Sequence, residues 1–300
     1  MDIFNTEIWR IGIVSAPIQE VAAAGSLEQF SVKWIEAEDA FCFLADPFGI
    51  WRDDKLYLFV EAYDYRTRCG YIVAYVLDAN LNILESRPVL REDWHLSYPV
   101  VFEAQGEIWM LPEAYKSGRL TLYRASEFPW QWQPVPEFQF PEAAIDASPL
   151  FYAQRWWMFY TPPSPKAART STLKLASADH LFGPWDQHPI QTLREDKSGA
   201  RMGGTPFLAE GKIVLPTQDC RETYGAAVQL LSFPTESLPY PELSSAHRLC
   251  APLHNAPYLQ GLHTLSQAGP VTLVDTKRIR HGSPGRLLIE LSRLWRKPRD

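Results

Sequence analysis

Cysteine is scarce in this sequence. The 300 residues include four cysteines, Cys42, Cys69, Cys220 and Cys250, and no two of them form a C-x-x-C pair. This spacing excludes a zinc site built on paired cysteines. We expect four separate thiols, mostly buried, in a reducing compartment.

Long hydrophobic runs and an excess of positive charge are also missing. No stretch of about 18 apolar residues is present, so we expect no membrane-spanning helix. The first ten residues include Asp2 and Glu7 and lack the apolar region of a secretory signal, which predicts a cytoplasmic protein. The 29 Lys and Arg are outnumbered by 35 Asp and Glu. A net charge of −6 argues against nucleic acid as a partner.

Proline and aromatic residues are abundant, and one proline pattern recurs. A polar or aromatic residue precedes a proline, and an apolar run, a short turn and a second apolar run follow. The prolines are Pro47, Pro99, Pro149 and Pro206, and residues 261–274 form a fifth, degenerate copy. The gaps of 52, 50 and 57 residues are typical of the blades of a β-propeller.

We therefore predict an all-β fold, a five-bladed β-propeller over residues 1–282. The blades are expected to start near residues 46, 98, 148, 205 and 262, with a strand over residues 9–14 closing the ring. A β-sandwich with coincidental spacing is the alternative.

The last 18 residues differ from the rest. Residues 285–297 have helical periodicity, with basic residues on one face and Leu287, Leu288, Leu291, Leu294 and Trp295 on much of the other. We predict a basic, helical tail over residues 283–300. A short amphipathic helix of this kind can contact the anionic inner face of a membrane. Packing against the propeller is the alternative.

The predicted topology brings many polar side chains to one mouth of the central channel, because the inner strand of each blade begins where the second strand ends. The carboxylates expected there are Asp46, Glu61, Glu113, Asp146 and Asp219. We also expect substrate-binding residues there, namely His95, Tyr98, Arg201, Gln218, Tyr224 and His263. Converging carboxylates raise each other's pKa and can divide acid and base roles between them. We predict no metal or other cofactor, with Ca²⁺ as the alternative that such oxygen atoms would suit.

Two resemblances follow from these residues. The run from Phe43 to Phe48, together with Asp146, resembles the five-bladed glycoside hydrolases of family 43. More specific motifs resemble the N-terminal propeller of glucosamine inositolphosphorylceramide transferases, over roughly residues 9–278. These motifs are Trp94–Pro99, Gly183-Pro184-Trp185 with His188-Pro189, and Gln218-Asp219-Cys220 with Thr223-Tyr224-Gly225.

The hydrolase resemblance implies Asp46 as the base and Asp146 as the residue that modulates pKa. The hydrolase family carries its acid, a Glu, at the start of blade four, where this sequence has Gly203-Gly204-Thr205. Glu113 or Asp219 would then have to donate the proton.

Three functions are compatible with these features. The first is glycosyl transfer in glycan assembly, with a carbohydrate or a nucleotide- or lipid-linked sugar as partner. The second is glycoside hydrolysis with a displaced acid, and the third is glycan binding without catalysis.

Overall fold

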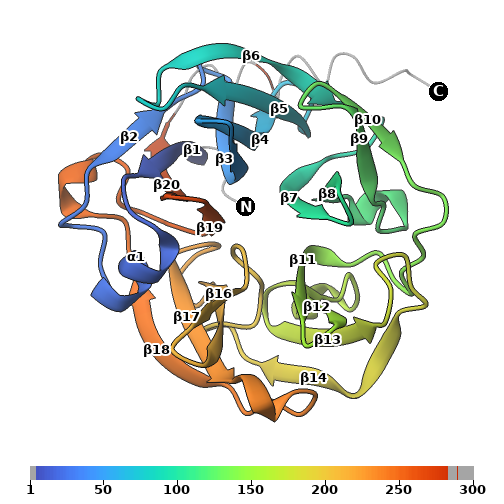
Figure 1. Ribbon diagram of the computed structural model, residues 1–300. Coiled ribbons are helices and arrows are strands. Elements are labelled where there is room, and N and C mark those ends of the chain that lie inside the picture. Colours follow the sequence, from blue (N-terminus) through green and yellow to red (C-terminus); the bar gives the residue numbers. More distant parts are fainter. Residues whose placement is uncertain (1–4, 283–288, 290–300) are drawn as a thin grey trace, which may run out of the picture.

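Five four-stranded antiparallel sheets surround a central axis in the computed structural model (Figure 1). The structure describes residues 5–282 and Ile289, without the side chains of residues 187–191. The predicted five-bladed β-propeller is confirmed. The predicted tail over residues 283–300, with its helix and membrane contact over 285–297, lies outside the described residues except for Ile289.

The first four blades follow one another along the chain, and each runs from the axis outward. Blade one contains β3 (Cys42–Arg52), β4 (Lys55–Asp64), β5 (Cys69–Leu77) and β6 (Ile83–Leu90). Blade two contains β7 (Ser97–Ala104), β8 (Glu107–Glu113), β9 (Tyr123–Glu127) and β10 (Gln131–Pro134). Blade three contains β11 (Ile145–Tyr152), β12 (Arg155–Thr161), β13 (Thr172–Ala178) and β14 (Asp186–Glu195). Blade four contains β15 (Phe207–Ala209), β16 (Lys212–Asp219), β17 (Ala227–Pro234) and β18 (Ser244–Leu249).

The fifth blade joins the two ends of the chain and closes the ring. Its strands are β19 (Leu265–Ala268), β20 (Val271–His281), β1 (Asn5–Val14) and β2 (Val32–Ile35). The strand predicted over residues 9–14 is the second half of β1, and β1 pairs with β20 along its whole length. This pairing holds the N-terminal strand by ten backbone partners.

Within residues 5–282, helical structure is confined to short connections. They are α1 (Ile18–Ala24) and the 3₁₀ turns η1 (Tyr115–Ser117), η2 (Lys166–Thr170), η3 (Thr235–Ser237) and η4 (Leu253–Asn255). The helix α1 was not predicted. Ile18 and Val21 anchor it in a core shared with Val228 and Leu249 of blade four.

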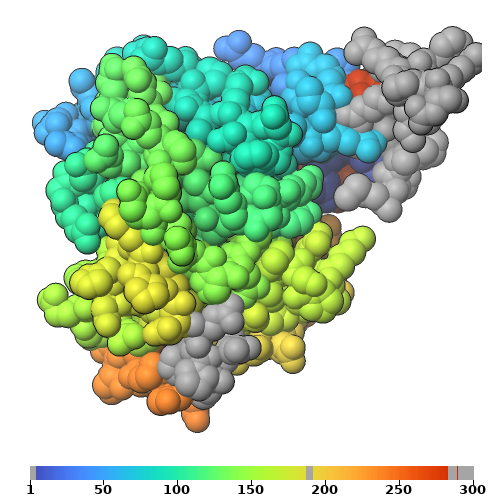
Figure 2. All heavy atoms as spheres, turned by 90° about the vertical axis from the view of Figure 1, so that its right-hand side faces the viewer, coloured from blue at the N-terminus to red at the C-terminus, as the bar shows by residue number. Residues whose placement is uncertain are grey.

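The hydrophobic cores lie between adjacent blades. Ile11 and Leu273 of blade five pack with Leu44 and Leu58 of blade one. Burial of each such side chain contributes about 1.5–3 kcal/mol. From the side, the outer strands of blades two and three, green to yellow, lie between blade one above and blade four below (Figure 2). The repeated packing of neighbouring blades fixes the inner strands around the axis, where the polar residues gather.

Candidate active site

Three innermost strands carry a β-bulge at the same level. The register shifts lie between Ala45 and Phe48, between Ser97 and Val100, and between Ile145 and Ser148. The bulged residues Asp46, Tyr98 and Asp146 have φ angles of 50°, 47° and 49°. A left-handed conformation costs a non-glycine residue of the order of 1–3 kcal/mol, and such strain concentrates at functional sites. An extra residue in a bulge also re-aims its side chain.

The bulges correct the predicted alignment of the third repeat. Pro149 pairs with Met158, beyond the bulge, whereas Ala147 occupies the position that Pro47 and Pro99 hold in blades one and two. The repeat prolines also lie inside or beside the inner strands rather than at their starts. A bulge tolerates proline because the extra residue leaves the hydrogen-bonded ladder there.

The second strands supply carboxylates at the matching level. Glu61 of β4 pairs with Ala45, and Glu113 of β8 pairs with Ser97, so each lies opposite the residue that precedes a bulge. Thr161 holds this position in blade three. Glu61 and Glu113 each lie 14 residues after a repeat proline, Pro47 and Pro99, and this equal offset explains why both were expected at one mouth.

Blade five completes a buried chain of ionisable groups around Asp46. Nδ1 of His263 lies 2.7 Å from Oδ2 of Asp275, and Nε2 of the same ring lies 3.6 Å from Oδ1 of Asp46. Asp275 also accepts hydrogen bonds from the backbone N–H groups of Asp46, His263 and Thr264. Asp275 was missed by the sequence reasoning. The available signal was an acid inside an apolar strand, in the run Val271–Asp275.

Burial is the largest influence on the pKa values of Asp46, Glu61 and His263. It raises the pKa of Asp46 to about 6, with His263 opposing the rise and Asp275 adding to it. Burial and the charge of Asp46 raise the pKa of Glu61 well above its usual range. For His263, burial alone lowers the pKa, but Asp275 and Asp46 outweigh it and the net pKa is raised. Glu61 is thereby favoured as a neutral neighbour of Asp46.

Glu113 is the second carboxyl with a pKa near neutrality. Burial raises its pKa to about 7, and the negative charge of Asp146 adds to the rise. Its two oxygens accept hydrogen bonds from the Ser97 hydroxyl at 2.9 Å and from the Tyr115 N–H at 2.7 Å. A carboxyl with this pKa can hold a proton at neutral pH and release it to a substrate.

Asp146 is bound by side chains of blade four and of the loop before it. Nε of Arg201 donates to Oδ2 at 2.6 Å and its NH2 group to Oδ1 at 3.2 Å, which makes a bidentate pair. Nε2 of Gln218 donates to the same Oδ2 at 3.0 Å. Such charge-assisted contacts are strong and directional. The predicted residues Asp146, Arg201 and Gln218 are therefore brought together.

Tyr98 links three blades across the centre. Its hydroxyl lies 2.9 Å from the Ser148 hydroxyl, accepts from the Gly204 N–H at 2.7 Å and donates to the Gly204 carbonyl at 3.0 Å. Its backbone N–H donates to Asp46. Tyr98 was predicted to bind substrate, but its hydroxyl is already satisfied by the protein.

Aromatic rings cover His263. Trp9 stacks on it with ring centroids 3.9 Å apart, and Tyr224 meets it edge-on at 5.5 Å. The buried Lys277 donates to the Tyr224 carbonyl at 2.6 Å and so holds this loop. Trp9 and Lys277 were not predicted, because they come from opposite ends of the chain. His263 and Tyr224 were both predicted as site residues.

His95 lies beside Glu61 as a neutral imidazole. Its Nδ1 accepts the Gly70 N–H at 2.8 Å, which leaves the proton on Nε2, 3.6 Å from Oε1 of Glu61. Burial lowers its pKa to about 4. His95 can donate a hydrogen bond here without carrying charge.

The chain matches one protein family over most of its length. The model of the family described as glucosamine inositolphosphorylceramide transferase 1, N-terminal, matches residues 30–245. The chain belongs to this family. The match includes Asp46, Glu61, Glu113 and Asp146, whereas His263 and Asp275 lie beyond it.

Curated members of the transferase family also match the chain. The glucosamine inositolphosphorylceramide transferase 1 of rice (Oryza sativa subsp. indica) is 38% identical over 192 residues, and that of Arabidopsis thaliana is 33% identical over 192 residues. The matched region covers 63% of this chain. The chain spans about a quarter of the length of these relatives, 26% and 25%.

Solved structures support the fold of the family. The catalytic domain of a family 62 α-L-arabinofuranosidase from Coprinopsis cinerea has a TM-score of 0.56 at 10% identity, covering 80% of this chain and 93% of that one. A family 117 glycoside hydrolase from Zobellia galactanivorans has a TM-score of 0.54 at 14% identity, covering 81% and 87%. At these identities the likeness shows the propeller fold alone.

Asp219 was also predicted as a possible acid. The structure does not bring it to the carboxyl groups of Asp46, Glu113 and Asp146. Arg221 and Arg248 donate to its carboxylate at 2.7 and 2.8 Å. Burial would raise its pKa, but these two partners lower it to about 2. Neighbouring strand residues point to opposite faces, so Gln218 faces Asp146 while Asp219 faces Arg248. A carboxylate this acidic makes a poor proton donor.

Three residues, including Asp46, lie close enough together to be considered as metal ligands. Ligand atoms of Asp46, His263 and Asp275 lie within 4.8 Å of one another. Calcium takes six to eight oxygen ligands, but this set contains an imidazole, and its carboxylates already accept N–H and hydroxyl groups. The residues therefore fit a hydrogen-bonded acid–base cluster and do not fit a calcium cage.

Proposed function

We propose that this protein transfers a glycosyl group in glycan assembly, with Asp46 as the general base and Glu113 as the general acid. One observation carries the proposal. Two buried carboxyls of neighbouring blades have their pKa raised to about 6 and about 7, which suits a base and an acid that work near neutral pH.

In this proposal Asp46 takes the proton of the acceptor hydroxyl as its oxygen bonds to the anomeric carbon. Glu113 gives its proton to the leaving oxygen as the donor's bond breaks. Asp146, which pairs with Arg201, contributes to the raised pKa values of both groups through its charge, and Arg201 opposes this rise.

The relatives' name mentions glucosamine and inositolphosphorylceramide. We accordingly propose a nucleotide- or lipid-linked sugar as substrate, with a phosphoinositol lipid as the first acceptor to test. The cytoplasmic location and the membrane contact of residues 285–297 remain predictions. No helix in the described part of the chain is long and apolar enough to cross a membrane.

A second candidate function, glycan binding without turnover, is favoured by burial. Asp46, Glu113 and Asp146 are 5%, 4% and 2% exposed, so a substrate reaches them only if surrounding groups move. Hydrolysis, with water as the acceptor, would use the same acid and base.

The test is incubation of the full chain with nucleotide-linked sugars and a phosphoinositol lipid in mixed micelles. Mass spectrometry of the lipid detects transfer, and assay of free sugar detects hydrolysis. Glu113→Gln should abolish a catalysed product, while Glu137→Gln, at an exposed glutamate, should not. Saturable sugar binding with neither product would favour the binding function.

A further inference from the structure

A small cavity lies at the junction of blades five and one, close to the candidate active site. It has a volume of about 70 Å³ and is lined by Trp9, Glu36, Asp39, Arg278 and Arg280, among other residues. Trp9 connects it to the site, because this ring stacks on His263. The volume would hold one group of about five heavy atoms, since one water needs roughly 10–15 Å³ of such cavity volume.

The acids around this cavity already have arginine partners. Oε1 of Glu36 lies 2.7 Å from NH1 of Arg10, and Oδ2 of Asp39 lies 2.6 Å from NH2 of Arg66. Within the residues that the structure describes, no carboxylate lies within 4 Å of the guanidinium of Arg278 or Arg280. The cavity thus contains two arginines that have no carboxylate partner within 4 Å among the described residues.

Arg278 packs against the ring of Tyr258. Its guanidinium lies over the Tyr258 ring at 4.7 Å, and Arg10 lies over the same ring at 4.2 Å. The Tyr258 hydroxyl donates to Glu36 at 3.1 Å. Nε of Arg278 is buried and has no hydrogen-bond partner, which is unfavourable unless a ligand accepts from it.

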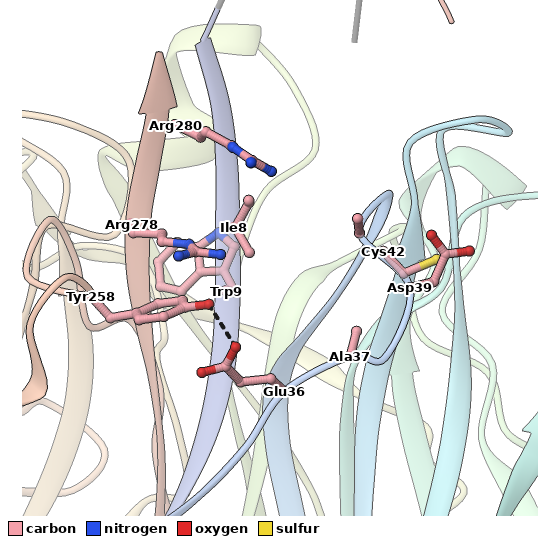
Figure 3. Close-up of a pocket in the computed structure, with 10 residues that line it drawn as sticks. Ile8, Trp9, Glu36, Ala37, Asp39, Cys42, Tyr258, Arg278 and Arg280 are labelled. Carbon is pink, nitrogen blue, oxygen red and sulfur yellow. Dashed lines mark hydrogen bonds between the residues drawn. The ribbon is translucent and has the colours of Figure 1, made fainter. Parts of the chain in front are cut away.

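Arg280 lies two residues further along β20, on the same side of the strand. Figure 3 shows Arg278 and Arg280 extending from β20 toward the segment with Asp39 and Cys42. Arg280 is exposed and Arg278 half-buried, so a ligand entering from solvent meets Arg280 first.

We propose that this cavity binds a phosphate group. Two guanidinium groups offer the planar, paired donors that match phosphate oxygens. The apolar side of the cavity, Ile8 and Ala37, would contact the group attached to the phosphate. This proposal does not depend on glycosyl transfer, since it concerns binding alone.

The experiment is isothermal titration of the full chain with inorganic phosphate at low ionic strength. We expect saturable binding that weakens with added salt. Arg280→Gln should weaken it at least ~10-fold, since the variant removes charge-assisted hydrogen bonds to the phosphate. The double variant Arg278→Gln with Arg280→Gln should bind no phosphate.

Arg91→Gln is the matched control. Arg91 is exposed and lies 3.5 Å over the Tyr71 ring, so this variant also removes one charge and one arginine–tyrosine stack. It should bind phosphate like the wild type. Because Arg278→Gln can disturb the Tyr258 packing, Arg280→Gln alone keeps the test independent of folding.

Two further ligands identify the source of the phosphate. Tighter binding of glycerophosphoinositol than of inorganic phosphate would assign the cavity to a lipid headgroup, and the reverse would assign it to free phosphate. Absence of saturable phosphate binding by the wild type, or unchanged binding by the double variant, would overturn the proposal. Neither result would bear on transfer activity.

Discussion

Oδ2 of Asp275 lies 2.7 Å from Nδ1 of His263, so the imidazole presents its other nitrogen to Asp46. The two residues lie 12 positions apart, at the start and the middle of the fifth blade's inner hairpin. Together they set the charge next to the proposed base. Asp275 is a positioning residue in this arrangement because it acts on Asp46 through His263 and through the Asp46 N–H.

Removal of the Asp46 charge should reduce turnover at least ~100-fold, the scale of a lost general base. Asp46→Asn preserves shape and suits the left-handed backbone. Asp54→Asn is the control, since Asp54 is exposed and has a φ angle of 55°. Initial rates of both variants, with circular dichroism to confirm folding, are the measurement. Equal rates for Asp46→Asn and wild type would remove Asp46 as the base.

The pH dependence of kcat/KM should be bell-shaped. The rate should rise through about pH 6 as Asp46 ionises and fall through about pH 7 as Glu113 loses its proton. Carboxyls with ordinary pKa values would place both limbs near pH 4. A profile without an alkaline limb would exclude Glu113 as the acid.

Asp275→Asn should lower the pKa of His263, because burial lowers this pKa and Asp275 is the largest opposing influence. The titration of the His263 ring protons by NMR measures the shift. Glu28→Gln, which removes an exposed carboxylate 3.2 Å from His254, should leave His263 unchanged. An unchanged His263 titration in Asp275→Asn would contradict the proposed coupling.

Gly225→Ala should impair the site far more than a glycine substitution elsewhere. A Cβ at Gly225 would lie 2.6 Å from Cβ of His263, at a φ angle of +61°. Gly118 has a φ angle of +82° and nothing within 4 Å, so Gly118→Ala controls for backbone strain alone. We expect a ~10-fold or larger loss of turnover or sugar binding beyond the control. Similar behaviour of the two variants would mean that the loop has room to move.

Asp219→Asn should act on stability and not on chemistry. The folded-state pKa of Asp219, about 2, lies below its ordinary value of 3.8, so its contribution is present above pH 4 and is lost as the pH falls toward 2. The variant should melt roughly 2–8 °C lower at pH 7. The difference from wild type should shrink in melts below pH 4. A loss of turnover with unchanged melting would restore Asp219 as a candidate acid.

The fold could be predicted because the sequence pattern of one blade recurs along the chain. Turn residues, prolines in or beside the inner strands, and apolar runs recur at spacings near 50, and each blade forms largely from its own stretch of chain. Glu61 and Glu113 followed from the same periodicity, since equal offsets from a proline reach equal levels of two blades.

The alignment of blade three needed the structure. The sequence pattern aligned Pro149 with Pro47, whereas hydrogen-bond register aligns Ala147 with it. One extra residue in a bulge changes which side chain faces the channel, and bulges depend on packing between strands. Successive residues of a strand point to opposite faces. This rule alone would have predicted that Gln218 and Asp219 face different sides of the sheet.

By itself, the sequence determined the propeller, its five repeats and most of the carboxylates at one mouth, since these depend on local strand and turn preferences. Only the tertiary structure decided the partners. Asp275 and His263 meet Asp46 from 217 or more residues away, Trp9 covers them from the other end of the chain, and two arginines anchor Asp219 elsewhere. These contacts depend on closure of the ring, and burial after closure sets the pKa values that give the residues their proposed roles.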